Sequence, residues 1–131
     1  MSQENVEIVR RFVNAFNEAD REAALSVLAP AFEYDATRAI GPWRGVHTLD
    51  QMPKLFDDLI AVWELNRYEA EDFLEAGEQV VTPFTNYLRG RDGIEVQARG
   101  VFVWRIRDEK ITNLKFFQER EEALAAAGLS E

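Results

Sequence analysis

The segment from Gly77 to Gln118 constrains the fold of this chain more than any other. It contains three stretches rich in residues typical of strands, at 78–89, 94–107 and 111–118, separated by two short turn sequences. Within 94–107, apolar and polar residues alternate over most of the length. Period-two alternation bounded by turn residues predicts an antiparallel meander. One face of such a sheet is apolar, and another layer has to cover it.

Four segments have the pattern of helices, and three of them precede the meander. Residues 3–19 are the clearest amphipathic segment, because their apolar residues recur three and four positions apart. A short second helix is predicted at 21–28, and a third begins near Thr48 and extends to about Trp63. A short helix at 119–127 follows the meander and ends at a glycine.

Two more strands are predicted, at 31–38 and 67–76, on either side of the third helix. The loop at 39–45 contains the turn sequence Gly41-Pro42. The order is therefore helix, helix, strand, helix and then strands, which predicts an α+β fold with helices on one face of a curved sheet. The length predicts one domain over 1–131.

Net charge and residue counts exclude several classes of partner and site. The formal net charge is −9, whereas proteins that bind nucleic acid usually present a basic face. No apolar run is long enough to span a bilayer, so we predict no membrane partner. With no Cys and a single His, we predict no metal site, and we expect no cofactor. The polar, acidic N-terminus and the absence of Cys favour a cytoplasmic protein.

The second strand of the meander also carries apolar residues on its charged parity, at Val101 and Val103. Both faces of the sheet are therefore predicted to be partly buried. The simplest explanation is a homodimer that packs through the outer face of the sheet. The alternative is a sheet with a few exposed apolar residues, which is common.

With these elements in place, the chain resembles the SnoaL-like branch of the nuclear transport factor 2-like superfamily, which includes relatives of ketosteroid isomerases and polyketide cyclases. The likeness rests on short sequences in a fixed order: 5–12 (NVEIVRRF), 15–17 (AFN), Asp20, 43–45 (WRG), 77–81 (GEQVV), 103–111 (VWRIRDEKI) and 121–129 (EEALAAAGL). The resemblance implies a cone-shaped barrel, in which the N-terminal helices cover the concave face of a curved, mostly antiparallel sheet. It also implies a dimer and an apolar pocket between helices and sheet. It leaves the chemistry open, because relatives include isomerases, cyclases, epoxide hydrolases and non-catalytic binders.

Asp35 is the candidate catalytic residue, because the resemblance to ketosteroid isomerases places the base there. A carboxylate at the mouth of an apolar cavity has a raised pKa and can move protons near neutral pH. The same resemblance places the oxyanion donors at Phe12 and about Phe102, which have no donor group, so an efficient enzyme of that type is not expected. The alternation also opposes the assignment. If Phe32 and Tyr34 face the core, Asp35 faces outward unless a bulge intervenes.

Two other kinds of catalytic site in the family find little support. Cyclase relatives carry a His on the strand that holds Phe102, whereas the single His of this chain, His47, falls in the predicted loop before the third helix. We interpret His47 as a solvated loop residue. The Asp-Arg-Asp relay of an epoxide hydrolase has no counterpart on an inward-facing parity.

The remaining candidates are aromatic and amide side chains that would line the pocket. The resemblance places Asn86 on the inward parity, where an unpaired amide would cost about 1–3 kcal/mol, so we expect it to contact a ligand or to bond Tyr34, Thr82 or a buried water. The same alternatives apply to Gln118, while the large aromatics either wall a pocket or simply pack the core. The predicted ligand-binding residues are Phe12, Phe16, Tyr34, Trp63, Asn86, Phe102, Trp104 and Gln118.

Two hypotheses for function follow. In the first, the protein binds a small, largely hydrophobic molecule in an apolar pocket, and Asp35, helped by Tyr34 or Asn86, transfers a proton or activates water without a cofactor. In the second, the domain is a non-catalytic ligand-binding or dimerisation module, and aromatic side chains partly fill its cavity. An ionisable group inside the cavity would separate the two. A third option is a purely structural dimer with a closed core.

Overall fold

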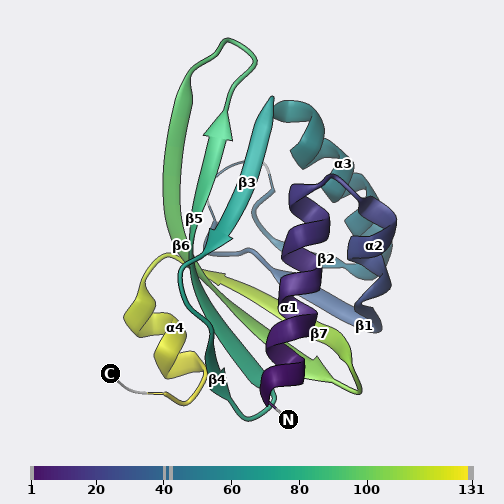
Figure 1. The fold of residues 1–131 in the computed structure, drawn as a ribbon, viewed down its shortest axis with the longest axis vertical. Helices are drawn as coiled ribbons and strands as arrows, with labels where there is room; N and C mark the ends of the chain where they lie inside the picture. Colours follow the sequence, from purple (N-terminus) through teal and green to yellow (C-terminus); the bar gives the residue numbers. More distant parts are fainter. Residues whose placement is uncertain (1, 40, 42, 130–131) are drawn as a thin grey trace.

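The structure, a computed structural model, describes residues 2–39, 41 and 43–129. Pro42 of the predicted Gly41-Pro42 turn lies outside the described residues. The elements are α1 (Ser2–Asn17), α2 (Arg21–Ser26), β1 (Leu28–Asp35), β2 (Val46–Thr48), the 3-10 turn η1 (Leu49–Gln51), α3 (Met52–Val62), β3 (Leu65–Ala70), β4 (Leu74–Ala76), β5 (Gln79–Arg89), β6 (Glu95–Arg107), β7 (Lys110–Phe117) and α4 (Arg120–Ala126) (Figure 1). Within the described part of the chain, no helix has the length and apolar character needed to cross a bilayer.

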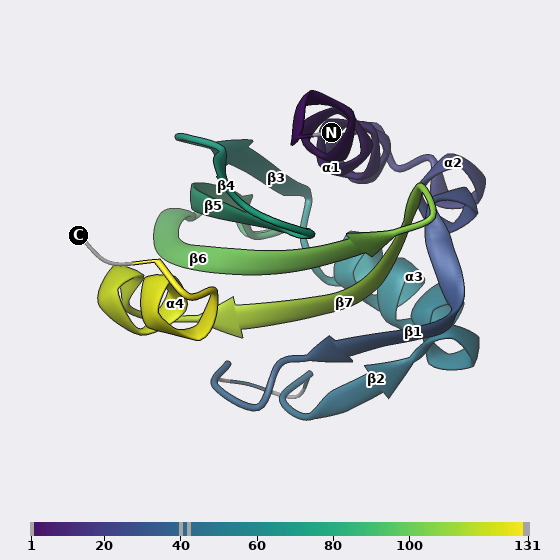
Figure 2. The ribbon, with the colours of Figure 1, turned by 90° about the horizontal axis from the view of Figure 1, so that it is seen from below.

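The strands form one curved sheet in the order β2-β1-β7-β6-β5-β3, with β4 paired to β5 beside β3. Only β1 and β7 are parallel, and the other pairs are antiparallel. Helices α1, α2 and α3 lie over one side of the sheet (Figure 2). The predicted α+β fold, with N-terminal helices on the concave face of a mostly antiparallel sheet, is confirmed. The sheet does not close, because β2 and β3 remain as edges.

The predicted meander corresponds to β5, β6 and β7, which pair in sequence order. Residues with positive φ form the two turns of the meander. Gly93 has a φ of 90° in the first, and Asp108 and Glu109 have φ values of 53° and 63° in the second. Two consecutive residues with positive φ match the twist of the flanking strands, as in a type I′ hairpin. The alternation therefore predicted this part of the sheet almost to the residue.

The segment predicted as one strand at 67–76 is interrupted. Ala70 pairs with Phe84 and Leu74 pairs with Val81, so three residues of this segment face only two on β5. An extra residue of this kind is accommodated as a bulge. Pro83 lies opposite the break and has no backbone N–H, and its carbonyl accepts a hydrogen bond from the amide of Glu71 at 2.7 Å. Sequence alternation alone could not reveal this break.

The elements near β1 also differ from the prediction. The chain enters β1 at Leu28, three residues earlier than expected, because α2 ends at Ser26. Residues 46–48 form the short strand β2, in register with residues 33–35 of β1, and Thr48 also caps the following turn as predicted, since its amide donates to Gln51 Oε1 at 2.9 Å. Edge strands this short carry little sequence signal.

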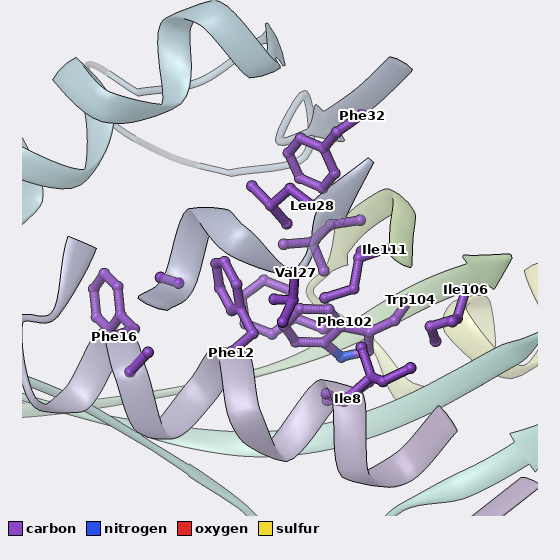
Figure 3. Packing of buried hydrophobic residues seen from close by; sticks show 14 of the residues in the cluster. Ile8, Phe12, Phe16, Val27, Leu28, Phe32, Phe102, Trp104, Ile106 and Ile111 are labelled. Atoms are coloured by element: carbon purple, nitrogen blue, oxygen red, sulfur yellow. The ribbon is translucent and has the colours of Figure 1, made fainter. Parts of the chain in front are cut away.

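The main core lies between the helices and the concave face of the sheet. Figure 3 shows Ile8 and Phe12 of α1 beside Phe102 and Trp104 of β6. Phe32, at 1% exposure, and Ile111, at 0%, belong to the same cluster on β1 and β7. The amphipathic stripe predicted for 3–19 therefore packs against the sheet, which is the contact that gives this helix most of its stability.

A second, smaller cluster lies on the opposite face, under α4 (Figure 1). Ala123 and Leu124 of α4 cover Val81, Val101 and Val103. The apolar residues on the charged parity of β6 are therefore buried within one chain. The argument for a homodimer loses part of its basis, and the dimer stays a prediction.

The hairpin between β5 and β6 extends past the helices (Figure 1). Ile94 and Val96 continue the inward apolar parity of β6, yet their side chains are 64% and 47% exposed. The C-terminal end of α3 contacts this hairpin through Arg91, whose guanidinium donates to the carbonyl of Ala61, but it leaves both apolar residues exposed, so the alternation continues beyond the core.

Candidate functional site

A cavity of about 310 Å³ opens between α3 and the concave face of the sheet. Aromatic and aliphatic side chains dominate its wall, and the polar members are amides, phenols and one arginine. The lining residues are Tyr34, Ala36, Ala39, Trp43, Leu55, Leu59, Trp63, Asn66, Tyr68, Phe84, Asn86, Leu88, Ala98, Arg99, Phe102, Phe116 and Gln118. Small-molecule sites typically enclose about 300–1,000 Å³, so this cavity suits a small ligand.

The cavity narrows inward to a recess of about 60 Å³ between α1, α3 and the sheet. Aromatic rings close this inner end. The ring of Trp104 lies 5.5 Å from those of Phe12 and Phe102, both edge-on, and Phe102 stacks on Phe84 at 4.4 Å. Trp104 is only 1% exposed, and its Nε1 donates to the Oγ1 of Thr82 at 2.9 Å. These aromatic side chains therefore pack the inner end of the cavity. The larger open space lies in the outer part, which is lined by Trp63, Asn86 and Gln118.

Tyr34 and Tyr68 line both the cavity and the recess. Burial raises the pKa of Tyr68 to about 12, and burial with smaller effects of Tyr68 and Asp35 raises the pKa of Tyr34. Both phenols therefore remain neutral at physiological pH and can donate a hydrogen bond. Among the described residues, neither hydroxyl has a hydrogen-bond partner, which leaves both available to a molecule in the cavity.

Asn66 and Asn86 form a pair on the neighbouring strands β3 and β5. Asn86 Nδ2 donates to Asn66 Oδ1 at 2.9 Å and to the backbone carbonyl of Arg67 at 3.1 Å. Asn86 is 8% exposed, so its amide is held firmly within the wall of the cavity. Tyr34 and Thr82 were among the expected partners, and neither is the partner found, since Thr82 accepts from Trp104 instead.

Asn17, the last residue of α1, holds the edge strand β3 in place. Its Nδ2 donates to the carbonyl of Tyr68 at 2.8 Å, and its Oδ1 accepts from the amide of Tyr68 at 2.9 Å. One side-chain amide thus satisfies both unpaired backbone groups of an edge residue, as a neighbouring strand would. Because Tyr68 lines the cavity, this contact positions the wall of the cavity as well as the strand.

We expect Asn17→Ala to lower the free energy of unfolding by about 1–3 kcal/mol, because the amide and carbonyl of Tyr68 would lose their partners. Urea denaturation followed by circular dichroism measures the change. Asn14→Ala, on an exposed position of the same helix, is the matched control and should stay within about 0.5 kcal/mol of the parent protein. Equal effects of the two substitutions would contradict the role of Asn17.

Asp35, the predicted catalytic residue, does not line the cavity, although its neighbours Tyr34 and Ala36 do. Its Oδ1 accepts from the backbone amide of Thr37 at 3.0 Å and from the Thr37 hydroxyl at 2.6 Å. Burial raises its pKa, but the bonds from Thr37 and the nearby charges of Arg38 and Lys115 outweigh burial, so the pKa lies below its ordinary value. A carboxylate in this state is a weak base facing away from the cavity.

The eight predicted ligand-binding residues all border the cavity or its recess. Phe12, Phe16 and Trp104 line the recess, and Trp63, Asn86 and Gln118 line the wider part. Tyr34 and Phe102 line both. Whether they contact a ligand stays a prediction.

His47 lies on β2 rather than in a solvated loop, so that interpretation was wrong. It pairs in register with Tyr34, and the two rings are 5.9 Å apart. Its Nε2 donates to the carbonyl of Trp43 at 2.8 Å. The ring of His47 is half-buried, and it does not line the cavity.

Sequence reasoning missed the contributions of Asn17, Asn66 and Tyr68. One usable signal was the alternation in β3, where Asn66, Tyr68 and Ala70 alternate with the charged residues Arg67 and Glu69. This pattern would have placed Asn66 and Tyr68 on the inward face of the strand. No sequence signal links Asn17 to Tyr68, because the two are 51 positions apart.

Comparison with known sequences identifies one family. A family model described as a SnoaL-like domain matches residues 9–114. No curated protein matches the chain.

Solved structures share the fold at low sequence identity. The Delta 5-3-ketosteroid isomerase from Mycobacterium sp. is 20% identical, with a TM-score of 0.76 over 88% of this chain and 93% of that chain. RV0760c from Mycobacterium tuberculosis, in complex with estradiol-17beta-hemisuccinate, is 16% identical, with a TM-score of 0.77 over 89% and 95%. A Catenulispora acidiphila protein with a ketosteroid isomerase-like fold, in complex with trimethylamine, is 21% identical, with a TM-score of 0.75 over 94% and 93%.

Proposed function

Because the chain belongs to the SnoaL-like domain family, we propose that it binds one small, largely hydrophobic and uncharged molecule in the cavity, without catalysis. The observation that carries this proposal is the chemistry of the wall. Among the described residues that line the cavity, none is Asp, Glu or His. The wall therefore offers apolar surface and neutral hydrogen-bonding groups, which favour binding over proton transfer.

The absence of a counter-charge argues for an uncharged ligand. Arg99 is the one charged residue among the described lining residues, but its side chain is 83% exposed and its Nε lies 4.0 Å from a carboxylate oxygen of Glu71. An ion inside the cavity would lose its hydration without a partner, which costs far more than burying a neutral group. Fold relatives bind estradiol-17beta-hemisuccinate and trimethylamine, so small-molecule binding by this fold has precedent.

The catalytic alternative assigns proton transfer or water activation to Asp35. It requires the carboxylate to leave Thr37 and turn into the cavity. Under this alternative, Asp35→Asn abolishes turnover of a substrate bound beside Tyr34. Under the proposal above, binding is unaffected and no turnover exists.

We expect the parent protein to bind naphthalene, and Asp35→Asn to bind it with a Kd within about twofold of the parent. Saturation near a hundred times Kd should stabilise the fold by about 2.7 kcal/mol, which a thermal-shift assay resolves. Ala98→Phe, which places a ring in the cavity, should weaken binding at least about tenfold. Gln97→Phe, an exposed neighbour outside the cavity wall, is the matched control. No binding by the parent, or equal effects of Ala98→Phe and Gln97→Phe, would overturn the proposal.

The homodimer and the cytoplasmic location remain proposals. Sedimentation velocity tests the first, because a dimer through the outer face should dissociate when Arg105→Glu or Lys115→Glu places a charge of opposite sign there. Both residues border a hollow on that face, between β7 and α4.

A further inference from the structure

The Asn66–Asn86 pair has a defined orientation, since one of its partners is a backbone carbonyl. The Arg67 carbonyl can only accept, so the atom of Asn86 that bonds it must be the amino group. The same amino group donates to Asn66, so the atom of Asn66 that faces it must be the carbonyl oxygen. This leaves Asn86 Oδ1 as a free acceptor and Asn66 Nδ2 as a free donor.

Both free atoms border open space. Among the described residues, no polar side-chain atom is fully buried without a partner. Asn86 Oδ1 and Asn66 Nδ2 have no partner in the described part of the chain, so each retains accessible surface. The open space next to both residues is the cavity that they line. Each free atom shares a carbon with one of the two bonded atoms, which lie 2.9 Å apart, so the donor and the acceptor belong to two adjoining amide groups.

We propose that the ligand of this cavity is a planar, uncharged ring system that carries a hydrogen-bond donor next to an acceptor, as in a cyclic amide, and that Asn86 Oδ1 and Asn66 Nδ2 bind these two groups. This inference rests on the proposed function. Aromatic side chains on the wall favour a planar ring, since Trp63, Tyr68, Phe84 and Phe102 all line the cavity and offer ring surface to a ligand.

Other ligand chemistries satisfy the pair less well. A carboxylate would accept from Asn66 but would repel the oxygen of Asn86, since it brings no donor. A ligand with only a carbonyl leaves Asn86 Oδ1 without a partner in an 8% exposed site. A site built to bind a polar group discriminates strongly against an analogue that lacks it, because its own buried group then stays unpaired.

The test compares three bicyclic probes by isothermal titration calorimetry: 2-quinolinone, coumarin and naphthalene. The first two differ only in a ring N–H or a ring oxygen, and naphthalene has neither group. We expect 2-quinolinone to bind the parent protein at least about tenfold more tightly than coumarin. Asn86→Leu should remove this difference, whereas Asn66→Ala should weaken the binding of both probes, because both carry the carbonyl that Asn66 binds. Asn113→Leu, which borders a hollow on the other face of the sheet, should retain it.

The outcomes separate this inference from the proposed function. Equal affinities of 2-quinolinone and coumarin for the parent protein, with naphthalene still bound, overturn the inference and leave the proposed function standing. A preference that survives in Asn86→Leu also overturns it, because other atoms then recognise the N–H, and so does unchanged affinity of both carbonyl-bearing probes for Asn66→Ala. Failure of all three probes to bind overturns the proposed function and this inference together.

Discussion

Replacing Phe102 by alanine should lower the free energy of unfolding by about 3–5 kcal/mol, the largest effect expected for a single side chain of this protein. Phe102 is 8% exposed and lies at the centre of the aromatic cluster. Its ring contacts those of Tyr34, Tyr68, Phe84, Trp104 and Phe116. Truncation removes the buried area of the ring and leaves a void that these neighbours cannot all fill, because they come from five different strands.

Urea denaturation with a fixed m-value measures this loss. Phe73→Ala is the control, because Phe73 is only partly buried and its ring is covered by the guanidinium of Arg10 at 4.3 Å. That substitution should cost less than half as much. Since the void in Phe102→Ala adjoins the cavity and is apolar, naphthalene should stabilise this variant more than the parent. A cost below about 1 kcal/mol would show that the cluster is loosely packed.

The stability of the protein should fall steeply above pH 10, because two tyrosines that lie partly buried against the core resist ionisation. Burial raises the pKa of Tyr68 to about 12 and also raises that of Tyr34. Below pH 10 both the folded and the unfolded chain keep these protons, so the stability is fully present. Between pH 10 and 12 the unfolded chain releases them first, and each tyrosine lowers the free energy of unfolding by up to about 1.4 kcal/mol per pH unit.

Urea denaturation at a series of pH values from 8 to 12 tests this dependence. Lysines and arginines also titrate in this range, so the contribution of each tyrosine is the difference between the parent and its Tyr→Phe variant. Tyr68→Phe and Tyr34→Phe should each flatten the decline, and the double variant should flatten it most. If the Tyr→Phe variants lose stability above pH 10 as steeply as the parent, the phenols are not buried in the folded state.

Prediction from sequence succeeded where the signal is local. The alternation of β6 and the turns at Gly93 and Asp108 predicted the meander, because strand periodicity and turn conformation depend on near neighbours. The break between β3 and β4 was not predictable in this way. The break lies opposite Pro83 of β5, which has no backbone N–H to pair with the neighbouring strand.

The candidate site was predictable in its residue types but not in its geometry. Aromatic residues such as Phe12 and Trp104 were expected either to wall a cavity or to pack the core, and in the structure they pack together at the inner end of the cavity. Asp35 follows the alternation rather than the resemblance, because the register shift of β1 lies before Glu33 and Thr37 binds the carboxylate of Asp35, which does not line the cavity. A resemblance transfers a position along the chain, whereas the direction of a side chain depends on the local register of the sheet.

The sequence by itself determined the two main layers of this protein, which are the amphipathic first helix and the three-stranded meander, and it identified the family of the chain. Only the tertiary structure decided where the interior stays open and which polar groups face it. The amides of Asn17 and Asn86 find their partners 51 and 20 positions away. Contacts of that kind depend on how the sheet curves and how the helices pack on it, and these are properties of the whole fold rather than of any segment.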